Sequence, residues 1–216
     1  MKERARDLEL LDVETPTPEE RVRLARYLAF VNRWLGGTSA VAYHVGRMGG
    51  GGVVVDVGSG AGDLPRALAR RFPRVRPVAV DMSGVLLALA DGVARVRGDA
   101  RRLPFRDGSV DVVVCSQLFH HLKDEEAVAV LREFARVARR GVVVSDLLRR
   151  RRAVFWIRLL TLWANRFAKS DGPLSVKRGF TVPEARALAA RAGLGWLRTR
   201  THFGHRFTLA GTRPAA

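Results

Sequence analysis

The sequence has almost no cysteine and no long hydrophobic run. Its single cysteine, Cys115, excludes an internal disulfide and any metal site built on several thiolates. The N-terminus reads Met-Lys-Glu-Arg-Ala-Arg-Asp and has no apolar core, so no signal peptide is expected. A mean hydropathy of −0.03 argues against both disordered and integral-membrane compositions. We therefore expect a reduced, cytoplasmic globular protein, and 216 residues are enough for a single domain.

Acidic residues are scarce in the last third of the chain. Residues 1–150 hold 25 Lys and Arg against 19 Asp and Glu, whereas residues 151–216 hold 13 against 2. Most of the net charge of +17 is therefore concentrated in a short stretch. Such a surplus predicts an anionic partner, which is a nucleic acid, an anionic membrane surface or an acidic substrate.

Apolar runs alternate with helical patterns along most of the chain. Strands are predicted at 53–57, 75–80, 94–97, 110–115, 141–145, 194–201 and 205–210. Helices are predicted at 17–35, 39–47, 65–72, after Ser83, and at 125–139, 150–167 and 183–192. Residues 1–15 are charged without a clear period and are predicted to form a loose arm. This alternation predicts an α/β fold with a parallel sheet and right-handed crossovers.

A glycine-rich loop follows the first predicted strand directly. It reads Asp56-Val57-Gly58-Ser59-Gly60-Ala61-Gly62-Asp63. Three glycines at alternate positions allow a tight turn and a close approach of the backbone to a ligand. The third glycine comes one residue earlier than in a dinucleotide-binding loop. Taken alone, the loop is also compatible with an ordinary strand-to-helix turn.

Three acids lie at the carboxyl ends of the first three predicted strands. Asp56 precedes the glycines, where a carboxylate disfavours a phosphate and suits an amine-bearing cation. Asp81 ends the second strand, where an acid can accept hydrogen bonds from ribose hydroxyls. Asp99 follows the third strand, where an adenine amine can lie. Together these acids predict a nucleoside with a positive charge at the carboxyl edge of the sheet.

Several stretches together resemble the class I S-adenosylmethionine-dependent methyltransferases, and most closely their small-molecule quinone- and polyketide-tailoring members. The stretches are VVVDVGSGAGD (53–63), VDMS (80–83), GDARRLPF (98–105), VDVVVCSQLFHHL (110–122) and LREFARVARRGVVVSDLL (131–148). The resemblance implies a Rossmann-like, doubly wound, mostly parallel seven-stranded sheet with an antiparallel last strand. It divides the single domain into a helical N-terminal lid (1–50), a cofactor-binding core (51–148), a substrate-lid insertion (149–182) and a closing helix and strand pair (183–216).

The resemblance also implies a role for each motif residue. Gly58, Ser59, Gly60 and Gly62 would line the methionine part of S-adenosylmethionine, and Asp56 would face its amino group. The remaining cofactor contacts would come from residues at later strand ends and from the N-terminal lid. These are Asp81 at the ribose, Met82, Asp99 and Ala100 at the adenine, Ser116 and Gln117 at the border with the acceptor, and Arg33 at the cofactor carboxylate. Arg33 is also compatible with a solvated helix position.

Two adjacent histidines, His120 and His121, follow the fourth predicted strand, near the expected position of the methyl group. A histidine can remove a proton from a phenol or enol near neutral pH. His120 is the first choice for such a base, although both residues are also compatible with hydrogen bonds to loop backbone. Asp146, after the fifth strand, is an alternative. We expect no metal ion.

The basic segment 149–167 has three open interpretations. Trp156, Leu159, Leu160, Trp163 and Phe167 form one helical stripe. The stripe can line the acceptor pocket as a lid, rest on an anionic membrane that holds a lipophilic acceptor, or pack in the core or a homodimer interface. The segment is interrupted by arginines and is shorter than a bilayer span, so a transmembrane helix is not expected.

The sequence therefore favours a methyltransferase acting on a small, lipophilic, phenolic, polyketide-like or quinone-like acceptor. Oxygen is favoured over carbon as the methylated atom. The alternatives are a nucleic-acid methyltransferase, which the charge would suit, and a non-catalytic cofactor-binding scaffold. Ser116-Gln117-Leu118-Phe119 stands where a base-flipping enzyme would carry an Asn-Pro-Pro-Tyr type of motif, so nucleic acid is disfavoured.

Overall fold

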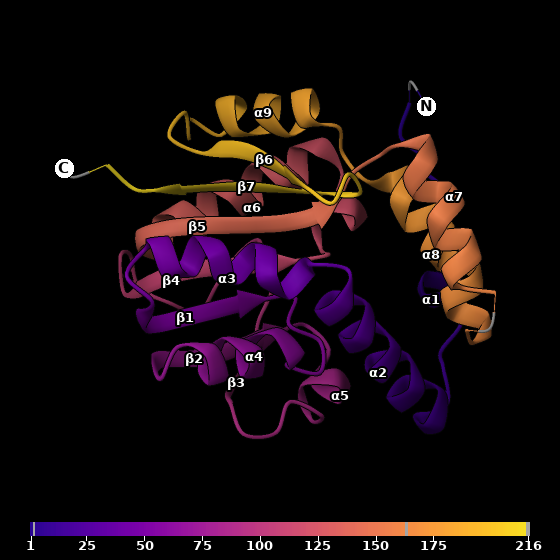
Figure 1. Ribbon diagram of the computed structural model, residues 1–216. Helices are drawn as coiled ribbons and strands as arrows, with labels where there is room; N and C mark the ends of the chain where they lie inside the picture. The colour runs from indigo at the N-terminus through magenta and orange to yellow at the C-terminus, as the bar shows by residue number, and fades with distance from the viewer. Residues whose placement is uncertain (2, 163, 215–216) are drawn as a thin grey trace.

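The computed structural model describes residues 1, 3–162 and 164–214. Seven strands form one sheet in the order β3-β2-β1-β4-β5-β7-β6 (Figure 1). The strands are β1 Gly51–Val57, β2 Arg74–Asp81, β3 Ala94–Arg97, β4 Val110–Ser116, β5 Ala138–Leu147, β6 Arg198–His202 and β7 Arg206–Thr212. Neighbours from β3 to β5 are parallel, and β7 is antiparallel to both β5 and β6. The predicted Rossmann-like sheet with an antiparallel last strand is confirmed.

Both faces of the sheet are covered by helices, which is why its central strands are valine-rich without alternation. Helices α3 (Gly37–Arg47) and α4 (Asp63–Arg71) cover one face, over Val54 and Val112. Helices α6 (Asp124–Val137) and α9 (Val182–Arg191) cover the other, over Val55 and Val113. A short helix α5 (Gly84–Leu87) packs beside β2 and β3. The two apolar cores hold the strand ends in fixed positions.

A second group of helices lies at the end of the sheet toward which β1 and β5 point (Figure 1). These are α1 (Leu10–Val13), α2 (Pro18–Trp34), α7 (Arg151–Leu160) and α8 (Arg166–Arg178). Helix α2 begins as predicted, because the Thr17 hydroxyl accepts from the Glu20 backbone N–H and the Glu20 carboxylate accepts from the Thr17 N–H. The four helices close the edge where parallel α/β sheets bind ligands.

The single helix predicted at 150–167 is wrong, because the chain breaks there into two helices. The Thr161 hydroxyl donates to the Ile157 carbonyl at 2.8 Å at the end of α7, and Asn165 caps α8 by accepting from the Ala168 N–H at 2.9 Å. Phe167 therefore leaves the predicted stripe and is buried on α8. Trp163 lies outside the described residues. The rest of the stripe, which is Trp156, Leu159 and Leu160, is exposed and does not line the cavity at the end of the sheet.

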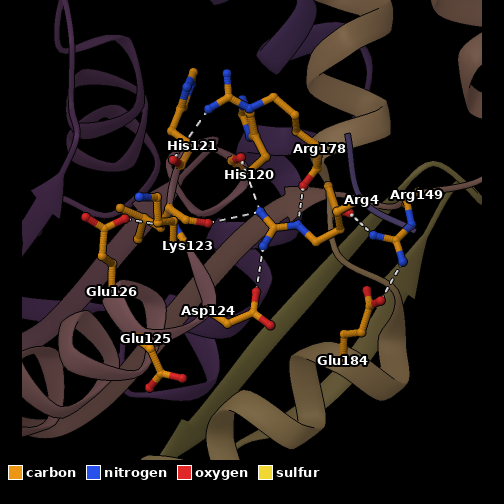
Figure 2. Close-up of polar contacts among 12 residues, drawn as sticks. Arg4, His120, His121, Lys123, Asp124, Glu125, Glu126, Arg149, Arg178 and Glu184 are labelled. Carbon is orange, nitrogen blue, oxygen red and sulfur yellow. Dashed lines mark hydrogen bonds and ion pairs between the residues drawn. The ribbon is translucent and has the colours of Figure 1, made fainter. Parts of the chain in front are cut away.

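The loose arm predicted at residues 1–15 is also wrong, since residues 3–15 are docked on the molecule. The Arg4 guanidinium lies 3.7 Å from the centre of the Phe180 ring and donates to the Arg178 carbonyl at 2.8 Å. It also pairs with Asp124 at 2.8 Å, as Figure 2 shows. All of these partners lie more than 100 positions away in the sequence, so no local pattern reveals the contact.

Candidate active site

A cavity of about 610 Å³ lies between the carboxyl edge of the sheet and the helices that close it. It collects eight of the site residues predicted from the sequence. They are Asp56, Gly58, Ser59, Gly60, Ser116, Gln117, His120 and His121. The opposite walls come from the docked arm, from α2 and from α8. Other predicted residues, namely Gly62, Asp81, Met82, Asp99, Ala100 and Arg33, are not among the lining residues, so the cavity gathers most, but not all, of the predicted site.

The glycine loop is bent back against β2 by two hydrogen bonds, from the backbone N–H groups of Gly58 and Ser59 to the Val80 carbonyl. Gly60 has φ +54°, and a Cβ placed there would meet no atom within 4 Å. Gly62 has φ +73°, and a Cβ there would come within 2.7 Å of the Ala90 Cβ. Gly60 therefore leaves room at the cavity, whereas Gly62 allows close packing against the segment after α5.

Asp56 lies at the base of this loop with its carboxyl group buried and facing the cavity. Its Oδ1 has no hydrogen-bond partner among the described residues. Burial raises the pKa of Asp56 well above its usual value, the neighbouring Ser59 hydroxyl opposes this rise, and the nearby carboxylates of Asp63 and Asp81 add to it. An unpartnered buried acid in a cavity is a strong acceptor for a cationic ligand.

The charge of the cavity wall is opposite to the charge of the chain. Among the described lining residues, five are acids and one, Arg21, is an arginine. The acids are Glu9, Glu14, Asp56, Asp63 and Asp171. Glu9 pairs with Arg178 and Glu14 with Arg166, so Asp56, Asp63 and Asp171 are the acids that give this wall its remaining preference for a small cation over a polyanion.

We expect Asp56→Asn to stabilise the free protein while weakening its binding of a cationic ligand. Because the folded-state pKa of Asp56 is raised, ionisation of this carboxyl costs stability increasingly as the pH rises above the unfolded value near 3.8. Asparagine removes that cost. The melting temperature of the variant relative to the original should therefore rise with pH from about pH 4 upward. Thermal unfolding across a pH series measures it, and a difference that does not change with pH would contradict the prediction.

Asp81 lies behind the loop and holds it. Its Oδ2 accepts from the Gly60 N–H and its Oδ1 from the Ser83 N–H, both at 2.8 Å. Each carboxylate oxygen keeps a further lone pair. Met82, beside it, is exposed. Asp81 is thus adjacent to the cavity through Gly60, although it does not line it.

Asp99 does not line the cavity, and its carboxylate is paired with a neighbouring arginine. Its carboxylate pairs with the Arg101 guanidinium at 2.7 Å and accepts from the Arg101 N–H at 2.8 Å. These contacts lower the pKa of Asp99 and keep it ionised. Ala100 next to it is half-buried against the main core. The adenine contacts expected of these two residues stay predictions.

His120 is held by a buried acid, Asp146. Its Nδ1 lies 2.7 Å from Asp146 Oδ1, and its backbone N–H donates to Oδ2 at 3.2 Å. Burial alone would raise the pKa of Asp146, but the His120 ring and its hydrogen bond outweigh burial and lower it. Because Nδ1 is engaged by the carboxylate, Nε2 is the ring nitrogen left for a ligand. The sequence named both residues as alternatives, and the structure brings them into direct contact.

Glu9 is a cavity residue that the sequence did not reveal. Its side chain is buried, Oε1 accepts from the Ser175 hydroxyl at 2.8 Å, and Oε2 lies 3.7 Å from His121 Nδ1. Burial raises the pKa of Glu9. The ligand atoms of Glu9, His120 and His121 lie within 4.8 Å of one another, a spacing that can hold a metal ion. The Arg178 guanidinium, 3.7 Å from Glu9 Oε1, already neutralises part of that negative charge.

Helix α2 reaches the strand ends through Asn32. Its Oδ1 accepts from Gln117 Nε2 and, at 3.1 Å, from Arg206 Nη2. Gln117 adopts φ +60°, an uncommon backbone conformation that turns the chain sharply after β4. Arg206 is fully buried, and this burial lowers its pKa to about 10. Arg33, in contrast, is exposed on α2 with its guanidinium 5.6 Å from the Trp34 ring, so the structure does not bring it into the cavity.

Comparisons with known proteins support the same family. The methyltransferase domain family matches residues 54–141. The chain is 34% identical over 101 residues to a demethylmenaquinone methyltransferase of Thermotoga maritima, covering 44% of this chain and 43% of that protein. It is 33% identical over 79 residues to a malonyl-[acyl-carrier protein] O-methyltransferase of Xylella fastidiosa, covering 33% of this chain and 27% of that one. The matched region thus spans less than half of either relative.

A solved structure extends the likeness to most of the fold. The magnesium protoporphyrin IX methyltransferase of Synechocystis PCC 6803 with bound S-adenosylhomocysteine aligns with a TM-score of 0.60. The alignment covers 93% of this chain and 89% of that one at 18% identity, which establishes the shared fold. The same Synechocystis enzyme has also been solved with S-adenosylmethionine bound. Residues 54–141 are therefore similar to a methyltransferase domain, and most of the chain shares the fold of the Synechocystis enzyme.

Proposed function

We propose that the chain transfers the methyl group of S-adenosylmethionine to a small, lipophilic acceptor of phenolic, polyketide-like or quinone-like chemistry, with oxygen favoured over carbon. One observation carries the proposal: a single acid-lined cavity contains both the glycine loop and a histidine held by a buried aspartate. The loop suits the cationic cofactor, and the histidine suits an acceptor that must lose a proton.

The residues at the loop fit the cofactor chemically. Asp56 Oδ1, which is buried without a partner among the described residues, and the neighbouring Ser59 hydroxyl would meet the amino group of its methionine part. Gly60 offers an open backbone position, and Asp81 has lone pairs left for the ribose hydroxyls. When bound, the cofactor supplies an electrophilic methyl group on a positively charged sulfur. The surrounding acids favour this charged form over its neutral product.

His120 would act as the base in this proposal. Its free Nε2 would accept the proton of an acceptor hydroxyl, and Asp146 would stabilise the resulting imidazolium through Nδ1. The helices at the carboxyl edge would exclude water and hold the acceptor oxygen in line with the methyl group. His121, whose ring is tilted against that of His120 with ring centres 4.2 Å apart, would assist in orienting the acceptor.

The wall of the cavity opposite the glycine loop contains apolar side chains as well as charged ones. The apolar side chains come from α2, α7 and α8, namely Leu24, Leu28, Val31, Ile157 and Phe167. The names of the two relatives point in the same direction, since one acts on a demethylmenaquinone and the other is an O-methyltransferase. These observations favour an acceptor with a large apolar part and one ionisable oxygen.

The proposed acceptor class also bears on location. A lipophilic acceptor partitions into bilayers, so the proposal includes a cytoplasmic protein that contacts an anionic membrane through the basic segment 149–167. No helix among the described residues is long and apolar enough to cross a bilayer. A homodimer formed by the same segment is the rival arrangement.

Methylation of a panel of phenols and quinones, followed by mass spectrometry, tests the proposed function. We expect a mass gain of one methyl group in at least one lipophilic member and calorimetric binding of S-adenosylmethionine by the free protein. Methylation of RNA but of no panel member would favour the nucleic-acid alternative, which the acidic cavity opposes. Absence of cofactor binding would contradict the proposal altogether, and binding without any transfer would favour the scaffold alternative.

A further inference from the structure

Helix α7 has two apolar faces, and only one of them is covered. Ala153 and Val154 are buried, and Ile157 lines the cavity. The other face is exposed at residues 155, 156, 159 and 160, with exposed fractions from 42% at Leu159 to 64% at Phe155. One exposed aromatic side chain is ordinary, but four large apolar residues on one short helix are not. This outer face needs a partner.

Arginines surround the outer face. Arg150, Arg151, Arg152 and Arg158 are all exposed, and no ion pair is recorded for them within the described part of the chain. Residues 149–178 contain nine Lys and Arg and one acid, Asp171. An apolar face with exposed aromatic residues and a rim of arginines is the pattern of a helix that lies in the interface of an anionic bilayer.

The mouth of the cavity lies near this face. Leu11 on α1 and Leu28 on α2 both line the cavity and are both exposed, at 37% and 40%. The cavity therefore reaches the surface between α1 and α2. Helix α1 packs on α8, and α8 packs on α7, so the mouth and the outer face of α7 belong to one end of the molecule (Figure 1). Leu8 and Val13 add exposed apolar area beside the mouth.

We infer that this end of the molecule docks on an anionic membrane surface, with α7 as the docking helix and the cavity mouth opening at the lipid boundary. The arginines contact lipid phosphates, and Phe155 and Trp156 enter the interfacial layer. A lipophilic acceptor then passes from the bilayer into the cavity without crossing water. That last step rests on the proposed function, whereas the docking itself does not.

A second copy of the chain fits this face less well. In a two-fold dimer the same patch meets itself, so the four arginines of one copy would lie against the four of the other. Like charges facing each other at an interface oppose association. An anionic bilayer supplies the opposite charge together with an apolar layer. Charge complementarity therefore favours the membrane.

Vesicle co-sedimentation of the full chain tests the inference. We expect binding to phosphatidylcholine vesicles that contain phosphatidylglycerol, weakening with added salt, and little binding to phosphatidylcholine alone. The variant R151Q/R152Q/R158Q should bind about 100-fold more weakly, at about fivefold per arginine near an anionic surface. The control R70Q/R71Q/R74Q removes the same charge from exposed positions on α4 and β2 and should bind nearly as the original does.

Trp156→Ala separates docking from non-specific charge attraction. It should weaken binding to the anionic vesicles without a change in net charge, because the indole is lost from the interfacial layer. Equal weakening by both arginine triplets would overturn the inference, as would absence of vesicle binding. A dimer in sedimentation velocity that Trp156→Ala converts to monomer, without vesicle binding, would assign the face to a second copy instead. Calorimetry with S-adenosylmethionine on the same samples reports the proposed function separately.

Discussion

Replacing His120 by alanine is expected to lower the rate of methyl transfer to a hydroxyl acceptor by about 100- to 10,000-fold, the usual range for a lost general base. Binding of S-adenosylmethionine should change little, because the loop that would hold the cofactor makes no hydrogen bond to the His120 side chain. Turnover with a panel acceptor and calorimetry with the cofactor measure the two effects. His205→Ala is the control, since this histidine lies outside the cavity lining.

Asp146, whose carboxylate holds the His120 ring, provides a second test of the base. The pKa of Asp146 is lowered, so its carboxylate stays ionised across the neutral range, and its stabilising effect is lost only as the pH falls below the usual value near 3.8. Asp146→Asn should lower the rate near neutral pH, because the carboxylate that contacts His120 Nδ1 is lost. An unchanged rate in His120→Ala would remove His120 as the base.

Much of the fold follows from local patterns in the sequence. The valine runs and the capping box at Thr17 depend on neighbours a few residues away, and both are confirmed in the structure. The break between α7 and α8 is also a local effect, caused by Thr161 and Asn165, but a continuous apolar periodicity concealed it. Periodicity predicts which residues share one face of a helix, but it does not predict where the helix ends.

Some residues of the candidate site can likewise be predicted from local sequence patterns, and others cannot. The loop glycines and the acids at strand ends are set by sequence spacing, because parallel strands end at one edge. The position of Glu9 is not set by spacing, since it depends on long-range contacts of the N-terminal arm, such as those of Arg4 with Phe180 and with the Arg178 carbonyl, which span more than 170 positions. A charged N-terminal segment without periodicity gives no sign that one of its acids is buried. Long-range ion pairs of this kind require the structure.

The second large effect is expected from Asp81→Ala, which should weaken the binding of S-adenosylmethionine at least tenfold. Two hydrogen bonds to the ribose contribute about 1 kcal/mol each, and tenfold corresponds to about 1.4 kcal/mol. The substitution also removes the acceptors of the Gly60 and Ser83 N–H groups, so the loop loses its support from β2. Titration calorimetry measures the affinity directly.

Asp91→Ala is the matched control, because the Asp91 side chain is 89% exposed and lies away from the cavity lining. It removes the same charge from the same region of the chain and should leave the affinity unchanged. Thermal unfolding of both variants separates a local loss of binding from general unfolding. If Asp81→Ala bound the cofactor as tightly as Asp91→Ala, the ribose contact would not exist, and the position of the nucleoside beside the glycine loop would have to be abandoned.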